Sequence, residues 1–113
     1  MSSQFRATST PIEDGSLVTM VGTVDRAAKE PLEAAYAEAT RTPGRVVLDF
    51  REVDYINSTG IAVIVGLLAV ARSEGREIHA FGLTEHYREV FTITRLADFM
   101  TIHEDEEAAV AAG

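Results

Sequence analysis

The sequence has no cysteine among its 113 residues. Disulfide bonds and thiolate metal sites are therefore excluded, which fits a reducing compartment. The three histidines, His79, His86 and His103, also lack the H-E-x-x-H spacing of a helical zinc site. We therefore expect neither a metal ion nor another cofactor.

Basic residues are few. Ten Lys and Arg residues stand against eighteen Asp and Glu residues, which gives a formal net charge of −8. A surface of this sign repels phosphate backbones and anionic membranes. We therefore expect no direct binding to nucleic acid and no binding to a membrane.

Long apolar segments are missing as well. The apolar run at residues 61–71 is shorter than the roughly 20 residues that cross a bilayer. The first ten residues, MSSQFRATST, lack the apolar core of a signal peptide. We predict a cytoplasmic protein, and the length and ordinary composition predict one domain over residues 1–113.

Common catalytic motifs are absent too. No Gly-rich phosphate loop continues into Lys-Ser/Thr, and no G-x-S-x-G motif surrounds Ser58. We therefore expect that the protein is not an enzyme. A small hydrolase that uses Ser58 remains the catalytic alternative, and it would require turnover that Ser58→Ala abolishes.

What the sequence does contain is a strand, a polar turn and an apolar helix in direct succession. The run at residues 45–50 is apolar except for Asp49, which is typical of a strand that is covered on both faces. Residues 61–71 predict a helix inserted deeply under the sheet. A second reading leaves Ile61, with Ala62 or Val65, exposed near the turn as a docking patch.

The turn at residues 57–60 reads Asn-Ser-Thr-Gly. Asn57 or Ser58 is the expected N-cap, because Asn and Ser side chains accept hydrogen bonds from the free N–H groups of a first helical turn. Thr59 then falls on the first or second helical residue, with its hydroxyl facing solvent at the positive end of the helix dipole. Capping chemistry alone would explain these residues as an ordinary helix start.

The remaining elements complete an α/β pattern. We predict strands at residues 5–10 and 16–21, joined by a turn at Asp14-Gly15, and then a helix at 28–41. A strand at 77–81 is followed by a helix that Thr84 caps and that has Tyr87, Val90, Phe91 and Thr94 on one face. A strand at 100–102 and a terminal helix, opened by the acidic residues 104–107, complete the chain. Gly75 is the expected left-handed cap after the central helix. This order predicts a mixed central sheet of about five strands with about four helices.

Three segments in this pattern resemble the signature of the STAS domain family, in its bacterial anti-sigma-factor antagonist form. They are Val-Leu-Asp-Phe at 47–50, Val-Asp-Tyr-Ile at 53–56 and Asn-Ser-Thr-Gly at 57–60. The resemblance covers nearly the whole chain and implies a single-domain STAS-like fold. In bacterial antagonists, a kinase phosphorylates the residue before the motif's glycine. That residue corresponds to Thr59, with Ser58 as the alternative acceptor.

The resemblance also implies a function and a binding surface. An antagonist of this type binds an anti-sigma serine/threonine kinase in its unphosphorylated form and so releases a sigma factor, and a phosphatase is a further expected partner. We expect a monomer or a weak homodimer. The predicted partner-binding residues are Thr23, Val24, Asp25, Ile56, Asn57, Ser58, Gly60, Ile61 and Thr84.

One position differs from the family pattern, because Asn57 stands where the family usually has Asp. This difference favours an alternative function from another class. In that alternative, the chain is a constitutive STAS scaffold or a structural subunit of a signalling or transporter complex, and it is not phosphorylated.

Overall fold

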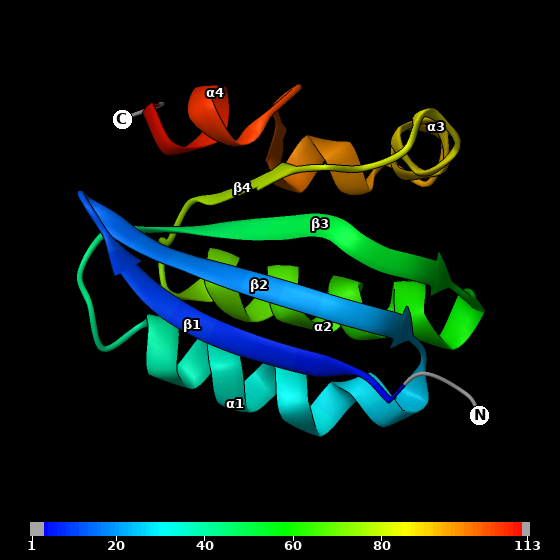
Figure 1. Cartoon of the computed structure of the whole chain (residues 1–113), viewed down its shortest axis with the longest axis horizontal. Helices are drawn as coiled ribbons and strands as arrows, with labels where there is room; N and C mark the ends of the chain where they lie inside the picture. The colour runs from blue at the N-terminus through cyan, green and yellow to red at the C-terminus, as the bar shows by residue number, and fades with distance from the viewer. Residues whose placement is uncertain (1–3, 112–113) are drawn as a thin grey trace.

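A five-stranded mixed sheet forms the centre of the molecule (Figure 1). The structure is a computed structural model that describes residues 4–111. The strands lie side by side in chain order, and they are β1 (Arg6–Ile12), β2 (Gly15–Val24), β3 (Arg45–Ile56), β4 (Ile78–Phe81) and β5 (Thr101–Ile102). β1 pairs antiparallel with β2, and all other neighbours are parallel. The predicted fold class is confirmed.

Four α-helices and two short 3-10 helices connect and cover the strands. They are η1 (Arg26–Ala28), α1 (Lys29–Ala39), α2 (Ser58–Ser73), α3 (Glu85–Ile93), η2 (Leu96–Phe99) and α4 (Glu106–Ala111). α1 and α2 lie on one face of the sheet and α4 lies on the other (Figure 1). Within residues 4–111, no helix is long and apolar enough to span a membrane.

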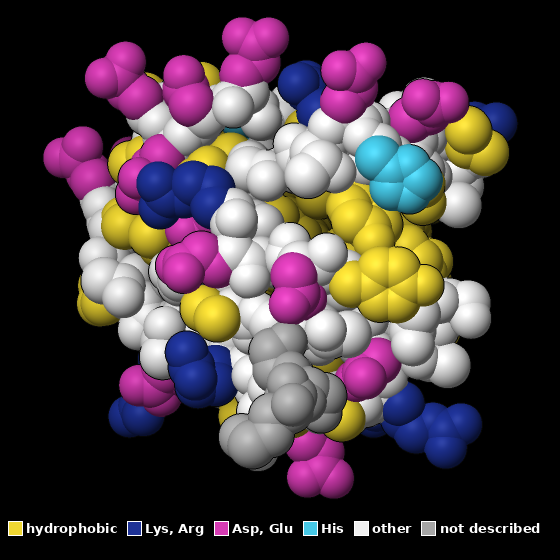
Figure 2. Space-filling model, turned by 45° about the vertical axis from the view of Figure 1, so that its right-hand side comes forward, with side chains coloured by type: hydrophobic (Ala, Val, Ile, Leu, Met, Phe, Trp, Pro, Cys, Tyr) yellow, Lys and Arg dark blue, Asp and Glu magenta, His cyan; other side chains and the backbone are white. Residues whose placement is uncertain are grey.

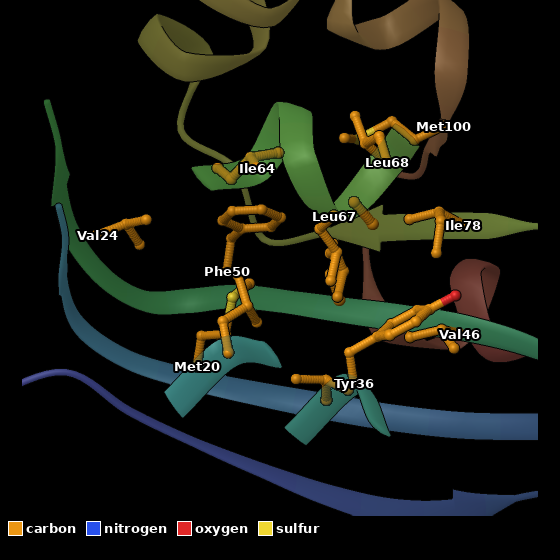
Figure 3. Close-up of a cluster of buried hydrophobic side chains, with 14 of the residues drawn as sticks. Met20, Val24, Tyr36, Val46, Phe50, Ile64, Leu67, Leu68, Ile78 and Met100 are labelled. Atoms are coloured by element: carbon orange, nitrogen blue, oxygen red, sulfur yellow. The ribbon is translucent and has the colours of Figure 1, made fainter. Parts of the chain in front are cut away.

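β3 is covered on both faces, as predicted. Its residues Val46, Leu48 and Phe50 belong to the main core, and the Phe50 ring meets Phe91 of α3 edge to face, with centroids 5.8 Å apart. Figure 3 shows Phe50 in one cluster with side chains from α2 and β2. Val47 instead packs in a smaller cluster beneath α4.

The predicted end of β3 at residue 50 is wrong, because the strand continues to Ile56. Its pairing with β4 stops at Asp49 opposite Phe81, whereas its pairing with β2 continues to Val24 opposite Ile56. The last six residues therefore lie at an open edge, which explains their polar composition and why the apolar pattern missed them.

Burial of α2 also differs from the prediction of a helix inserted deeply under the sheet. The buried residues form one stripe, made of Gly60, Ile64, Leu67, Leu68 and Ala71. On the opposite face, Val65 and Val70 remain 46% and 47% exposed. Ala62 is exposed as well, and Ile61 is partly buried. The second reading, with an exposed apolar patch near the turn, describes this face better.

Asp49 is a buried carboxylate in the centre of the sheet, 3% exposed. Its Oδ1 accepts the backbone N–H of Arg51 at 2.9 Å, and its Oδ2 accepts the Arg51 Nη2 at 2.9 Å. The same guanidinium lies 3.4 Å from Glu106 of α4 and 5.1 Å from the centre of the Phe81 ring. Burying a charge requires such a partner, so Arg51 both neutralises Asp49 and ties α4 to the sheet.

Most predicted turns and caps are confirmed. Asp14 takes a left-handed φ of 65° in the hairpin between β1 and β2, and Gly75 takes a φ of 68° after α2. Thr84 caps α3, where its hydroxyl accepts the Tyr87 N–H at 3.2 Å.

Some predicted boundaries are wrong. The helix predicted at 28–41 ends at Ala39, and a 3-10 turn at Arg26–Ala28 precedes it. Thr94 lies just beyond α3 and is exposed, so it does not share the buried face. The terminal helix begins at Glu106, after Asp105, whose side chain accepts the Ala108 N–H at 2.8 Å.

Gly60 marks the closest approach between α2 and the sheet. A Cβ atom on this residue would lie 1.9 Å from the carbonyl oxygen of Val24 in β2. Gly66, six residues further along the helix, has no atom of the other described segments within 4 Å of the corresponding position. The chain therefore requires glycine at residue 60 but not at residue 66.

We expect Gly60→Ala and Gly66→Ala to have opposite effects on the free energy of unfolding. Forcing a methyl group against the Val24 carbonyl should lower stability by about 3 kcal/mol, because overpacking a close contact shifts the backbone. The matched change at Gly66 should raise it by about 0.5–1 kcal/mol, since alanine favours a helix over glycine. Urea unfolding in dilute solution measures both, and equal effects would contradict the proposed contact.

Candidate functional site

The turn between β3 and α2 is held by the side chain of Asn57. This residue is extended, with φ −94° and ψ −176°, and its Oδ1 accepts the Gly60 N–H at 2.8 Å. The same oxygen accepts the Thr59 hydroxyl at 2.7 Å. Of the two predicted N-caps, Asn57 is therefore the cap, and Ser58 is the first residue of α2.

Thr59 occupies the second position of a sixteen-residue helix, and its side chain is exposed. The first turn of α2 contains no acidic residue. Helix N-termini carry free N–H groups and about half a positive charge, so this position favours an anion. Ser58 is also exposed, so accessibility does not distinguish the two hydroxyls.

The end of β2 lies directly beneath this turn. The Val24 carbonyl accepts the Asn57 N–H at 3.3 Å, and the Thr23 hydroxyl donates to Asp54 Oδ1 at 3.0 Å. The strand that we predicted at residues 16–21 continues through residues 22–24. Asp25 follows it and caps η1, where its side chain accepts the Ala27 N–H at 2.9 Å.

The start of α3 meets the end of β3 on the other side. The Ile56 N–H donates to the Tyr87 hydroxyl at 2.9 Å, which fixes α3 against the strand. Residues 82–84 and Tyr87 line a small hollow of about 30 Å³ together with Val53 and Ile56. The structure thus places three segments, residues 22–25, 53–61 and 82–85, together at the carboxyl ends of the parallel strands β2, β3 and β4. We call this surface the rim.

The predicted partner-binding residues differ in what their side chains can reach. Val24 and Ile56 are buried, and Gly60 has its backbone against β2, so these three position the turn. Ser58 and Thr84 are exposed at the rim. Partial burial is shared by the other four residues, Thr23, Asp25, Asn57 and Ile61.

Tyr55 is a rim residue that is absent from the predicted partner-binding set. Its side chain is 55% exposed, and it lies opposite Thr23 in the strand register. Figure 2 brings this side of the molecule forward and shows exposed hydrophobic side chains with acidic ones around them. The sequence contains one signal for the exposure of Tyr55. Ile56 is apolar and therefore expected to face the core, and adjacent residues in a strand face opposite sides of the sheet.

The charge of the rim has one sign. Its three segments contain Asp25, Asp54 and Glu85 and no Lys or Arg. The stretch from Tyr55 to Ile61 carries no formal charge at all. A partner can therefore cover the turn without desolvating an ion, whereas an anion added there has no basic side chain within these three segments to pair with. Arg51 also lines the hollow, but its guanidinium is already paired with Asp49 and Glu106.

Comparison with known proteins identifies relatives of this arrangement. A family model described as Mlab, STAS domain, matches residues 11–102. BtrV of Bordetella bronchiseptica, which is named as an anti-sigma factor antagonist, is 36% identical over 101 residues, covering 88% of this chain and 87% of BtrV.

Solved structures share the fold at low sequence identity. An anti-sigma factor antagonist from Mycobacterium paratuberculosis superimposes with a TM-score of 0.77 at 18% identity, covering 99% of this chain and 97% of that one. The Bacillus cell fate determinant SpoIIAA in its phosphorylated form gives a TM-score of 0.66 at 18% identity, covering 92% and 95%. From the family model and from BtrV, this chain belongs to the STAS domain family.

Proposed function

We propose that the protein is an anti-sigma-factor antagonist that binds an anti-sigma serine/threonine kinase through the rim. In this function, the unphosphorylated form binds the kinase and releases a sigma factor. The name and coverage of BtrV support the general role. The observation that carries the proposal is the Thr59 hydroxyl, which is exposed on an uncharged turn and held by Asn57 at the start of α2.

The unmodified turn suits a tight protein interface. Uncharged surface can be buried against a partner without the large cost of desolvating an ion. Tyr55 adds an exposed aromatic side chain beside the turn. Aromatic residues of this kind often contribute most of the binding energy of an interface. The rim therefore combines a neutral centre with one aromatic anchor.

A phosphate on Thr59 would change this surface by charge alone. It adds about −1.5 to −2 charges at neutral pH. Since the rim offers no Lys or Arg, the phosphate would have to be buried against the kinase or exclude it. An unpaired buried charge costs several kcal/mol, and about 3 kcal/mol corresponds to a hundredfold loss of affinity. The first-turn N–H groups can hold the phosphate, so no change of fold is needed.

Asn57 is compatible with this switch. It provides the same cap that an aspartate would provide, because a side-chain oxygen accepts the Gly60 N–H in either case. A carboxylate 2.7 Å from the Thr59 oxygen would repel a phosphate, whereas the neutral amide does not. The same neutrality favours the second candidate, an unphosphorylated STAS scaffold, because the charge usual in the family is missing.

Phosphorylation by a kinase of the anti-sigma type distinguishes the two candidates. With ATP, we expect one added phosphate by intact mass, retained in Ser58→Ala and Thr59→Ser and lost in Thr59→Ala. Phosphopeptide mapping should place it on residue 59. Phosphate on Ser58 alone would overturn the site. No phosphate, together with kinase-independent co-purification of another protein, would support the scaffold.

Charge at residue 59 should control kinase binding. We expect Thr59→Ala to bind the kinase about as well as the unmodified protein, since the turn stays neutral. Thr59→Glu should bind at least about tenfold more weakly, because one uncompensated charge at an interface costs over 1.4 kcal/mol. Isothermal titration calorimetry measures both affinities. The proposed switch would be wrong if the two variants bound equally.

Tyr55 should contribute to the same interface. We expect Tyr55→Ala to weaken kinase binding about tenfold or more, the usual effect of removing an aromatic anchor. Ile93→Ala is the matched control, because Ile93 is 71% exposed at the far end of α3 from the rim. Circular dichroism checks that both variants fold. A similar small effect of the two changes would exclude Tyr55 from the interface.

A further inference from the structure

The outer face of α2 is an exposed apolar surface separate from the rim. Val65 and Val70 are nearly half exposed there, and Ala62, Gly66 and Ala69 on the same face are also exposed. From residue 62 to residue 71 the helix carries no charged side chain. In a chain with a net charge of −8, so long an uncharged surface is a candidate for contact with another protein.

Two apolar grooves flank this face. The first, which we call the α1 groove, lies between α1 and α2, has a volume of about 320 Å³ and is lined by Leu32, Val63 and Leu67 among others. The second, the η2 groove, lies between α2 and η2 and has a volume of about 370 Å³. The exposed ridge of α2 thus stands between two hollows of similar size.

The two grooves carry opposite charges. Glu33 and Glu74 line the α1 groove; Glu33 is paired with Lys29 at 2.9 Å, so Glu74 provides the negative charge, and its carboxylate accepts the Tyr36 hydroxyl at 2.7 Å. Burial and this hydrogen bond raise the pKa of Tyr36 to about 12, so the phenol remains a donor at neutral pH. The η2 groove instead contains Arg72, whose guanidinium lies 5.2 Å from the centre of the Phe99 ring. Phe99 is itself 47% exposed.

We propose that a second copy of this chain docks on the outer face of α2, with the two α2 helices parallel about a two-fold axis that runs along them. Such an axis exchanges the two sides of the helix, so the α1 groove of each copy faces the η2 groove of the other. Arg72 then faces Glu74 of the second copy, and Phe99 enters the α1 groove. Both contacts occur twice.

Other arrangements lack this complementarity. An antiparallel pair places each groove against its own equivalent, so Arg72 and Glu74 no longer face each other. Only the parallel pair brings opposite charges together on both sides of the ridge. The grooves themselves therefore select the occupant and its direction, independently of the function proposed for the rim.

Gly66 agrees with a close approach of two helices. Glycine weakens a helix interior relative to alanine, and within residues 4–111 no other segment contacts the position of its missing Cβ. Small residues at a helix–helix contact allow the two backbones to approach closely. A second α2 helix crossing near Gly66 gives this glycine a role that the single chain does not.

Disulfide cross-linking tests the arrangement directly, because the chain has no native cysteine. Ala62→Cys and Ala69→Cys lie seven residues apart on the same face, and a disulfide requires Cα atoms within about 7 Å. In the parallel pair each variant cross-links with itself under mild oxidation. An antiparallel pair centred between them cross-links only when the two variants are mixed, which would overturn the proposed direction.

Ala34→Cys is the matched control, because Ala34 is exposed on α1 and does not line the α1 groove. We expect it to remain uncross-linked under the same conditions. Cross-linking of Ala62→Cys and Ala69→Cys no faster than that of Ala34→Cys would show that this face is not an interface between copies.

Charge reversal provides a second, independent test. By sedimentation equilibrium, we expect Arg72→Glu and Glu74→Arg each to raise the dimer dissociation constant about tenfold, since each change replaces two attractive pairs by repulsive ones. The double variant restores both pairs and should dimerise like the unmodified protein. The proposal would be overturned if the native chain stayed monomeric up to about 1 mM. This holds also if the same face then proved to bind a different protein.

Discussion

The carbonyl oxygen of Val24 occupies the space where a side chain on residue 60 would stand, only 1.9 Å from an ideal Cβ. The same oxygen accepts the Asn57 N–H, so one atom of β2 contacts both ends of the turn that starts α2. Because β2 is paired with β3 as far as Ile56, the position of the turn is set by the register of the sheet. Everything proposed for Thr59 depends on this contact.

A turn held in this way transmits a signal without moving. β2 supports it from below, and the hydrogen bond between Ile56 and Tyr87 ties it to α3. Packed contacts of this kind shift only at substantial cost, whereas a phosphate changes the charge of the surface at once. The site is therefore suited to a switch in electrostatics and shape, in which the phosphate is held by a helix start that already exists.

The parts of this site that the sequence predicted are those that depend on short-range chemistry. Asn57 and Thr84 are caps because their side chains bond to N–H groups three residues ahead, and that spacing is visible in the sequence. The continuation of β3 past residue 50 was missed because it depends on pairing with β2 alone. The open face of α2 was predicted only as a second reading, because apolar residues stand on both its buried and exposed sides and the pattern has no polar stripe. Tyr55 lies on this continuation of β3, so it was missed with it.

The direction of the proposed pair decides whether the two surfaces of α2 influence each other. Thr59 and Arg72 are thirteen residues apart, which is about 20 Å along a helix and about two Debye lengths at physiological salt. Phosphate on Thr59 therefore leaves the Arg72 contact within the pair largely unaffected. In the parallel arrangement, however, the two Thr59 turns lie at the same end, so two phosphates oppose each other there. An antiparallel pair would place them at opposite ends, and charge at the turn would then have no effect on pairing.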